Sequence, residues 1–115
     1  MVRIRTCYTF PMEGKYYRAI ISAPDKEQSG AILDSLLMQK IVAGGLISHG
    51  PSRYWWEGKI AEQDYYNISV FIPASKKELL IADVRKISKD ETPIVALFPM
   101  DGNQEFLDWV DESVA

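Results

Sequence analysis

The chain has 115 residues and a mass of 13.1 kDa, and 47% of its residues are apolar, which suits one compact domain with its own core. The 13 Lys and Arg residues face 16 Asp and Glu residues, so the net charge of -3 argues against nucleic-acid binding driven by charge. No apolar run approaches the about 20 residues of a membrane-spanning helix, and the N-terminal residues lack a signal-peptide core. Cys7, the only cysteine, excludes an internal disulfide, so we expect a cytoplasmic protein without a membrane partner.

The first predicted elements are a strand over residues 15–23 and a helix over residues 26–39. Tyr17, Ala19 and Ile21 alternate with residues of the opposite face, which is typical of a strand with a covered face. Asp25 and Gln28 have the spacing of a capping box that opens the helix. The helix then carries apolar residues at helical spacing and should pack on the sheet: Ile32, Leu33, Leu36 and Leu37.

The next predicted element is a long hairpin that turns at Gly58. Residues 41–56 precede the turn, with Gly44-Gly45 and Gly50-Pro51 read as bulges or bends, and a second strand follows it to Ile72. A single strand over residues 42–56 would be roughly 50 Å long at about 3.3 Å per residue, while a domain of this size is only about 35 Å across. The hairpin must therefore extend beyond its own domain. Its exposed aromatic residues predict an oligomer built by strand pairing between subunits: Tyr54, Trp55 and Trp56.

The last third of the chain predicts a helix, a strand and a second helix. Ser75 and Glu78 form a second capping-box pattern, which opens a helix to about residue 88. Residues 93–100 are wholly apolar, as expected of a central strand buried on both faces. Asn103 then caps a final helix. The order of elements predicts an α+β fold, a ferredoxin-like βαββαβ sandwich with both main helices on one face of the sheet.

Residues 1–14 form an extension ahead of this domain, which we place at residues 15–115. Val2, Ile4, Thr6, Tyr8 and Phe10 alternate with Arg3, Arg5 and Cys7. The alternation predicts an added N-terminal strand, folded back on its own domain or lying along a neighbouring subunit.

Several motifs together resemble the CutA divalent-cation tolerance family, in order and spacing, from about Tyr16 to Val114. They are Ser22-Ala23-Pro24-Asp25, Tyr54-Trp55-Trp56-Glu57-Gly58-Lys59-Ile60, Thr92-Pro93-Ile94 and Asp101-Gly102-Asn103 with Leu107 and Trp109. The resemblance implies a PII-like homotrimer of ferredoxin-like subunits whose long hairpins interlock around the threefold axis. It also implies a role in divalent-ion tolerance, with a response to metal ions and binding of copper or another divalent cation.

Three positions depart from the family pattern. The cysteine that copper-associated members carry after the first helix falls on or beside Gly44, and the usual His-Pro-Tyr is Ser88-Lys89-Asp90. The usual Lys-Thr pair is missing from residues 71–74. Fold and assembly therefore carry over from the resemblance more directly than metal binding does.

The candidate metal ligands are His49 and Cys7. Copper and zinc sites use several nitrogen or sulfur ligands, and a threefold axis would supply three copies of one histidine. The alternatives are a surface histidine and a structural free thiol. The acidic C-terminal residues are read as the charged surface of a helix, with weak divalent binding through oxygen as the alternative: Asp101, Glu105, Asp108, Asp111 and Glu112.

The ligand-cleft candidates are Tyr54, Trp56, Glu57 and Lys59 around the hairpin turn. The aromatic rings either stack on a planar ligand or bury area between subunits, and the two charges either line a pocket or are solvated. The alternative function is a PII-like trimeric sensor or scaffold that binds a small ligand or a partner protein in the cleft between subunits. No P-loop, nucleophile elbow or dinucleotide fingerprint is present in the sequence, so we do not expect an enzyme.

Overall fold

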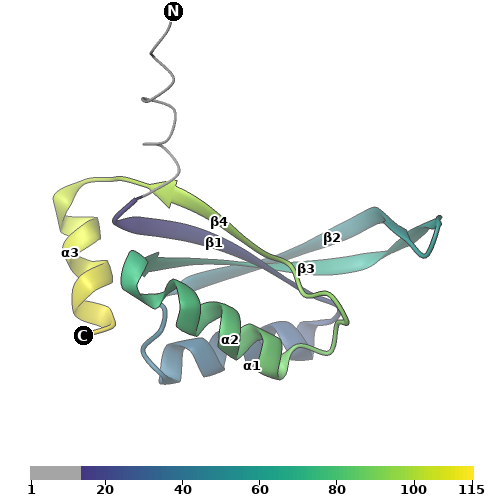
Figure 1. Cartoon of the computed structure of the whole chain (residues 1–115), viewed down its shortest axis with the longest axis horizontal. Helices are drawn as coiled ribbons and strands as arrows, with labels where there is room; N and C mark the ends of the chain where they lie inside the picture. Colours follow the sequence, from purple (N-terminus) through teal and green to yellow (C-terminus); the bar gives the residue numbers. More distant parts are fainter. Residues whose placement is uncertain (1–13) are drawn as a thin grey trace, which may run out of the picture.

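The computed structural model describes residues 14–115, so Cys7 and almost all of the predicted N-terminal strand lie outside the described residues. The elements in chain order are β1 (Tyr16–Ala23), α1 (Lys26–Met38), β2 (Gly45–Trp56), β3 (Lys59–Pro73), the 3₁₀ turn η2 (Ala74–Lys76), α2 (Lys77–Ile87), β4 (Val95–Met100) and α3 (Gln104–Ser113). The four strands form one antiparallel sheet in the order β2-β3-β1-β4, and α1 and α2 lie on one face of it (Figure 1). The predicted ferredoxin-like sandwich is confirmed.

The core lies between these two helices and the face of the sheet that they cover. Ala19 and Ile21 of β1 are buried there, as the alternation of the sequence predicts. The other fully buried side chains include Ile32 and Leu36 of α1, Ile68, Val70 and Ile72 of β3, and Leu80 and Val84 of α2. Each fully buried Ile, Leu or Val contributes about 1.5–3 kcal/mol relative to exposure, so this layer carries most of the stability of the domain.

The β2–β3 hairpin pairs without interruption from Gly45 opposite Val70 to Trp56 opposite Lys59. No bulge therefore interrupts the strand at Gly45 or at residues 50–51, which contradicts the predicted bulges, while Gly44 lies before the strand. β2 lies at the edge of the sheet, and an edge strand tolerates Pro51 because a proline, which has no N–H, costs no hydrogen bond on the side that faces away from the sheet. The predicted turn at Gly58 is confirmed: positive φ angles of 50° at Glu57 and 80° at Gly58 fit the tight two-residue turn that hairpins prefer.

The tip of this hairpin extends beyond the rest of the sheet. β1 pairs with β3 only over residues 66–73, so residues 59–65 of β3 pair with β2 alone. Figure 1 shows the two strands running past the ends of α1 and α2 to the turn. The predicted overhang is confirmed, although β2 begins at Gly45 and is shorter than the predicted strand over residues 42–56.

Two predictions about the C-terminal third are wrong. Within residues 14–115, β4 is an edge strand that pairs only with β1, although its wholly apolar sequence predicts a central strand buried on both faces. Phe98 of β4 is 46% exposed, because it lies opposite Arg18 of β1 on the face of the sheet away from α1 and α2, so the strand is not buried on both faces. Ser75 belongs to η2 and does not cap α2, which begins at Lys77. The residue at the N-cap position is Lys76, and its side chain makes no capping hydrogen bond.

The other capping predictions are confirmed in position but only partly in mechanism. The side chain of Asp25 accepts a hydrogen bond from the backbone N–H of Gln28 at 2.7 Å, as a cap of α1 should. The side chain of Gln28 does not complete the box, because its oxygen instead accepts from the backbone N–H of Lys89. Asn103 precedes α3 without a side-chain cap, and its amide donates to Glu105.

α3 packs against the sheet from the side away from α1 and α2. Phe106 meets Phe71 of β3 edge to face, with the ring centres 5.1 Å apart. The hydroxyl of Tyr16 donates to Asp111 at 2.7 Å. No helix in the described part of the chain is long and apolar enough to cross a membrane.

Candidate functional site

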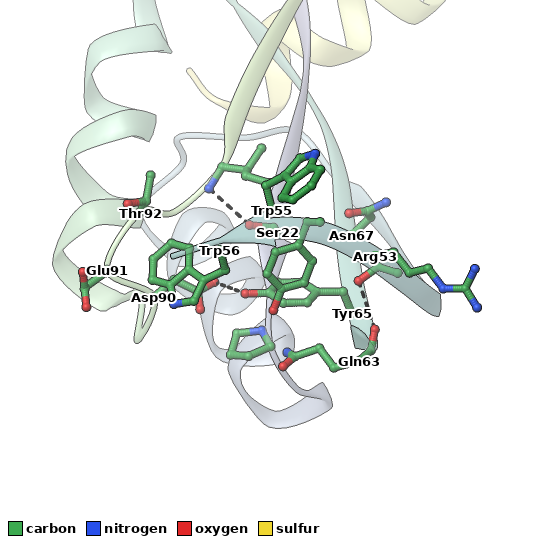
Figure 2. A pocket seen from close by; sticks show the side chains of 14 residues that line it. Ser22, Arg53, Trp55, Trp56, Gln63, Tyr65, Asn67, Asp90, Glu91 and Thr92 are labelled. Carbon is green, nitrogen blue, oxygen red and sulfur yellow. Dashed lines mark hydrogen bonds between the residues drawn. The ribbon is translucent and has the colours of Figure 1, made fainter. Parts of the chain in front are cut away.

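A cavity of about 690 Å³ lies between the hairpin and the loop that leads from α2 to β4. Residues of β2 and β3 form one wall, the end of β1 forms the floor, and residues 90–92 of the loop form the other wall (Figure 2). The side chains that matter most for its chemistry are Tyr54, Trp55, Trp56, Tyr65, Asp90 and Glu91. Its volume is in the range of about 300–1,000 Å³ that small-molecule sites occupy.

A hydrogen bond between Tyr65 and Asp90 joins the two walls. The hydroxyl of Tyr65 donates to Oδ2 of Asp90 at 2.7 Å. Burial, followed by this hydrogen bond and the charge of Asp90, raises the pKa of the Tyr65 phenol well above its usual value of 10.0. Tyr65 therefore stays neutral as a donor, and the negative charge at this point belongs to the carboxylate. The ring of Tyr54 meets that of Tyr65 edge to face, with their centres 5.8 Å apart.

The loop that carries Asp90 is fixed at both of its ends. The backbone N–H of Asp90 donates to the hydroxyl of Ser88 at 3.1 Å, and the N–H of Lys89 donates to the buried side chain of Gln28. At the other end, the N–H of Ile94 donates to the hydroxyl of Ser22, and Ile94 accepts from the N–H of Ser22, each at 3.2 Å. The position of Asp90 thus depends on α1 and β1 as well as on the loop.

The structure divides the four predicted cleft residues into two pairs. Tyr54 and Trp56 line the cavity, whereas Glu57 and Lys59 flank the turn as exposed residues outside it. Sequence analysis missed Tyr65 as a site residue, because its partner Asp90 is 25 positions away and only the fold brings them together.

Of the two predicted metal ligands, Cys7 lies outside the described residues, and His49 joins no group of three or more possible ligands within residues 14–115. His49 is exposed and stacks on Tyr66, with ring centres 4.8 Å apart and planes 21° apart, beside a smaller hollow of about 300 Å³. Within residues 14–115, no group of three or more His, Cys, Asp or Glu side chains is placed to hold a metal ion. The residues of one described protomer therefore do not fit a copper or zinc centre.

The surroundings of Gly44, where the resemblance places a cysteine, leave little space for a side chain. A Cβ atom added at Gly44 would lie 3.0 Å from the ring of Trp109, so a cysteine there would force this ring to move. The acidic residues of α3 are engaged locally, since Asp108 accepts from Gln104 at 2.8 Å and Asp111 accepts from Tyr16. Gly44 and the acidic residues of α3 are therefore interpreted as structural rather than metal-binding residues.

Comparison with known proteins decides the family. The model of the CutA1 divalent ion tolerance protein family matches residues 18–113. The chain belongs to the CutA1 divalent ion tolerance family. A relative from Archaeoglobus fulgidus, named divalent-cation tolerance protein CutA, is 34% identical over 95 residues, which are 82% of this chain and 93% of the relative. The CutA relative from Thermococcus kodakarensis is 26% identical over 88 residues, which are 76% of this chain and 85% of that protein.

Solved CutA structures confirm the fold. The structure described as the periplasmic divalent cation tolerance protein CutA from Archaeoglobus fulgidus has a TM-score of 0.84 and 32% identity, covering 87% of this chain and 99% of that chain. CutA1 from Oryza sativa has a TM-score of 0.82 and 24% identity, covering 87% and 94% of the two chains. The family match spans the hairpin, the loop and α3, so the cavity is part of the CutA1 domain itself.

Proposed function

We propose that this CutA1 protein acts in divalent-ion tolerance as a homotrimer in which neighbouring subunits pair their strands around the hairpins. The observation that carries the proposal is the overhang of residues 50–56 and 59–65, which have no other strand beside them in the described chain. Trp55 on this overhang is 74% exposed and Leu46 at the start of β2 is 73% exposed. Exposed apolar side chains along an open strand edge favour aggregation unless another chain covers them.

The two edges of the sheet support a ring of subunits. β2 and β4 are different strands, and each has one side that no strand covers within residues 14–115. Pairing of one subunit's β2 with the next subunit's β4 is a head-to-tail contact, which repeats until the ring closes. Closure at three subunits then covers both edges at once.

Light scattering on a size-exclusion peak tests the assembly. The proposal predicts about 39 kDa, three times the 13.1 kDa of one chain, and a mass near 13 kDa refutes it. Trp55→Lys should lower this mass, because it places a charge on the hairpin. Met38→Lys is the matched control at the end of α1, since Met38 is 85% exposed and lies away from the hairpin.

We propose copper or another divalent cation as the metal to which the protein responds. Since one described protomer lacks a set of ligands, a bound metal requires ligands from more than one subunit or from residues 1–13. Calorimetric titration with copper and zinc tests this, with His49→Ala and Cys7→Ser as variants. Stoichiometric binding that either substitution abolishes supports a metal site, and absence of heat from the wild-type trimer excludes one.

The second candidate function is a trimeric sensor that binds a small ligand. The cavity between the hairpin and the loop favours it, because aromatic rings and carboxylates converge there on about 690 Å³ of space. A shift of the unfolding temperature with small ligands, in the absence of any shift with metal ions, distinguishes this function from metal binding.

We propose the cytoplasm as the compartment. The single cysteine in the sequence supports a reducing environment, since proteins of oxidising compartments commonly use disulfides. The Archaeoglobus structure is described as periplasmic, so the two compartments are the alternatives. Fractionation of cells that produce the protein, with a periplasmic marker, distinguishes them.

A further inference from the structure

The cavity combines aromatic walls with carboxylates, and this combination indicates the charge of its ligand. Rings of Trp56 and Tyr65 line the side formed by the hairpin, while Asp90 and Glu91 stand on the loop opposite (Figure 2). The faces of aromatic rings carry partial negative charge and attract cations, tryptophan most strongly. Rings and carboxylates thus favour the same kind of ligand.

The charge balance of the cavity is negative. Among residues 14–115, Arg53 is the only basic residue that lines it, and its Nε lies 3.4 Å from Glu62 on the neighbouring strand. Figure 2 shows the guanidinium of Arg53 directed away from the labelled rings. In the described part of the chain, neither Asp90 nor Glu91 forms an ion pair, and only Oδ2 of Asp90 is occupied by the Tyr65 hydroxyl.

These groups select against two other classes of ligand. A phosphate or carboxylate ligand would face Asp90 and Glu91. Within residues 14–115 the one basic lining residue, Arg53, is directed away from the rings and paired with Glu62, so anions are disfavoured. A divalent metal ion takes six or more oxygen ligands, waters included, or several nitrogen and sulfur ligands. The cavity offers two carboxylates, and no group of three or more His, Cys, Asp or Glu side chains within residues 14–115 is placed to hold a metal ion. An organic cation is weakly hydrated, so it can lose water against the rings and keep its charge beside a carboxylate.

We propose that this cavity binds a small alkylammonium compound, with the nitrogen against Trp56 and Tyr65 and close to Asp90. The proposed occupant is the free compound rather than a lipid headgroup, because the volume of about 690 Å³ is that of a small-molecule site. The site deepens the sensor candidate above and rests on it. The residues named here all belong to one protomer, and the hairpin that carries Trp56 is also the element around which the proposed trimer assembles.

Choline is the probe for this site, titrated into the full-length protein by calorimetry and by tryptophan fluorescence. The neutral analogue 3,3-dimethylbutan-1-ol has the same shape without the charge. The proposal predicts saturable choline binding and at least about tenfold weaker binding of the analogue, since only the cation gains the ring and carboxylate interactions. Equal binding of the two compounds overturns the proposal.

Two substitutions locate the binding, each with a matched control. Asp90→Asn and Trp56→Leu should each weaken choline binding about fivefold or more. Asp64→Asn removes an exposed carboxylate of β3 outside the cavity, and Trp109→Leu removes a tryptophan of α3 that is 44% exposed, close to the 41% of Trp56. Both controls should bind as the wild type does, and equal losses in a variant and its control contradict the assignment.

The remaining outcomes separate this inference from the proposed function. Absence of choline binding in a protein whose mass is about 39 kDa overturns the inference and leaves the trimer in place. A mass near 13 kDa refutes the trimer whatever the choline result. Sedimentation of the protein with phosphatidylcholine vesicles, without binding of free choline, assigns the site to a lipid headgroup and overturns the small-molecule proposal. Thermal unfolding of each variant confirms that it is folded.

Discussion

The side chain of Gln28 connects the hydrophobic core to the loop of the cavity, and Gln28→Met tests this connection. Gln28 is 4% exposed, and its oxygen accepts from the backbone N–H of Lys89, next to Asp90. Methionine fills a similar volume but accepts no comparable hydrogen bond, so a partly buried N–H loses its partner. Such a loss costs about 1–3 kcal/mol. Because Lys89 itself is exposed, water offsets part of the loss, and we expect about 1–2 kcal/mol.

Urea unfolding followed by circular dichroism measures this loss, at a fixed protein concentration because assembly contributes to stability. Gln104→Met is the control, since Gln104 is an exposed residue of α3 whose amide bonds only Asp108, and it should cost less than about 0.5 kcal/mol. Choline binding should weaken in Gln28→Met, because Asp90 loses its anchored position. Equal stability of the two variants would refute the role of Gln28 in holding the loop.

Three further predictions concern single residues. Asp83→Ala removes the carboxylate that accepts from Ser35 of α1 at 2.8 Å and joins α2 to it, and it should cost about 1–3 kcal/mol in urea unfolding; a loss below about 0.5 kcal/mol contradicts the network. Gly58→Ala should cost about 1 kcal/mol because φ is 80° there, whereas Gly50→Ala, with equally open space around its Cβ, should cost less; equal costs argue against the turn. The pKa of Tyr65 is raised, so its contribution to stability is complete below pH 10 and is lost as the pH rises through the raised value. Tyr65→Phe should therefore remove no phenol ionisation from the absorbance titration near pH 10. Loss of one phenol's amplitude near pH 10 would contradict the raised pKa.

The secondary structure and most of the core could be predicted from local patterns. The alternation of Tyr17, Ala19 and Ile21 predicts which face of β1 is buried, and the Asp25 cap predicts where α1 begins. The position of β4 could not be predicted this way. An apolar run such as residues 95–100 is equally compatible with a central strand and with an edge strand that another subunit covers.

The candidate site could be predicted only on the side of the hairpin. Tyr54 and Trp56 are conspicuous in the sequence, and both line the cavity. The opposite wall depends on tertiary contacts, because Asp90 reaches Tyr65 only when the α2–β4 loop is anchored by Gln28 and Ser22. Asp90 follows Ser88 and Lys89 in a segment without an aromatic or histidine signal, although its carboxylate is one of the charged groups of the cavity.

Amide hydrogen exchange of the hairpin tests the central claim most directly, because paired strand edges are protected and free edges are not. In a free protomer only the amides of residues 50–56 that bond β3 are protected. If subunits pair their strands around the hairpin, the outward amides of these residues should also exchange almost as slowly as β1, which has strands on both sides. Protection should fall in Trp55→Lys and persist in Met38→Lys. Exchange of the outward amides of residues 50–56 within seconds in the wild-type protein, while β1 remains protected, would contradict the strand-paired trimer.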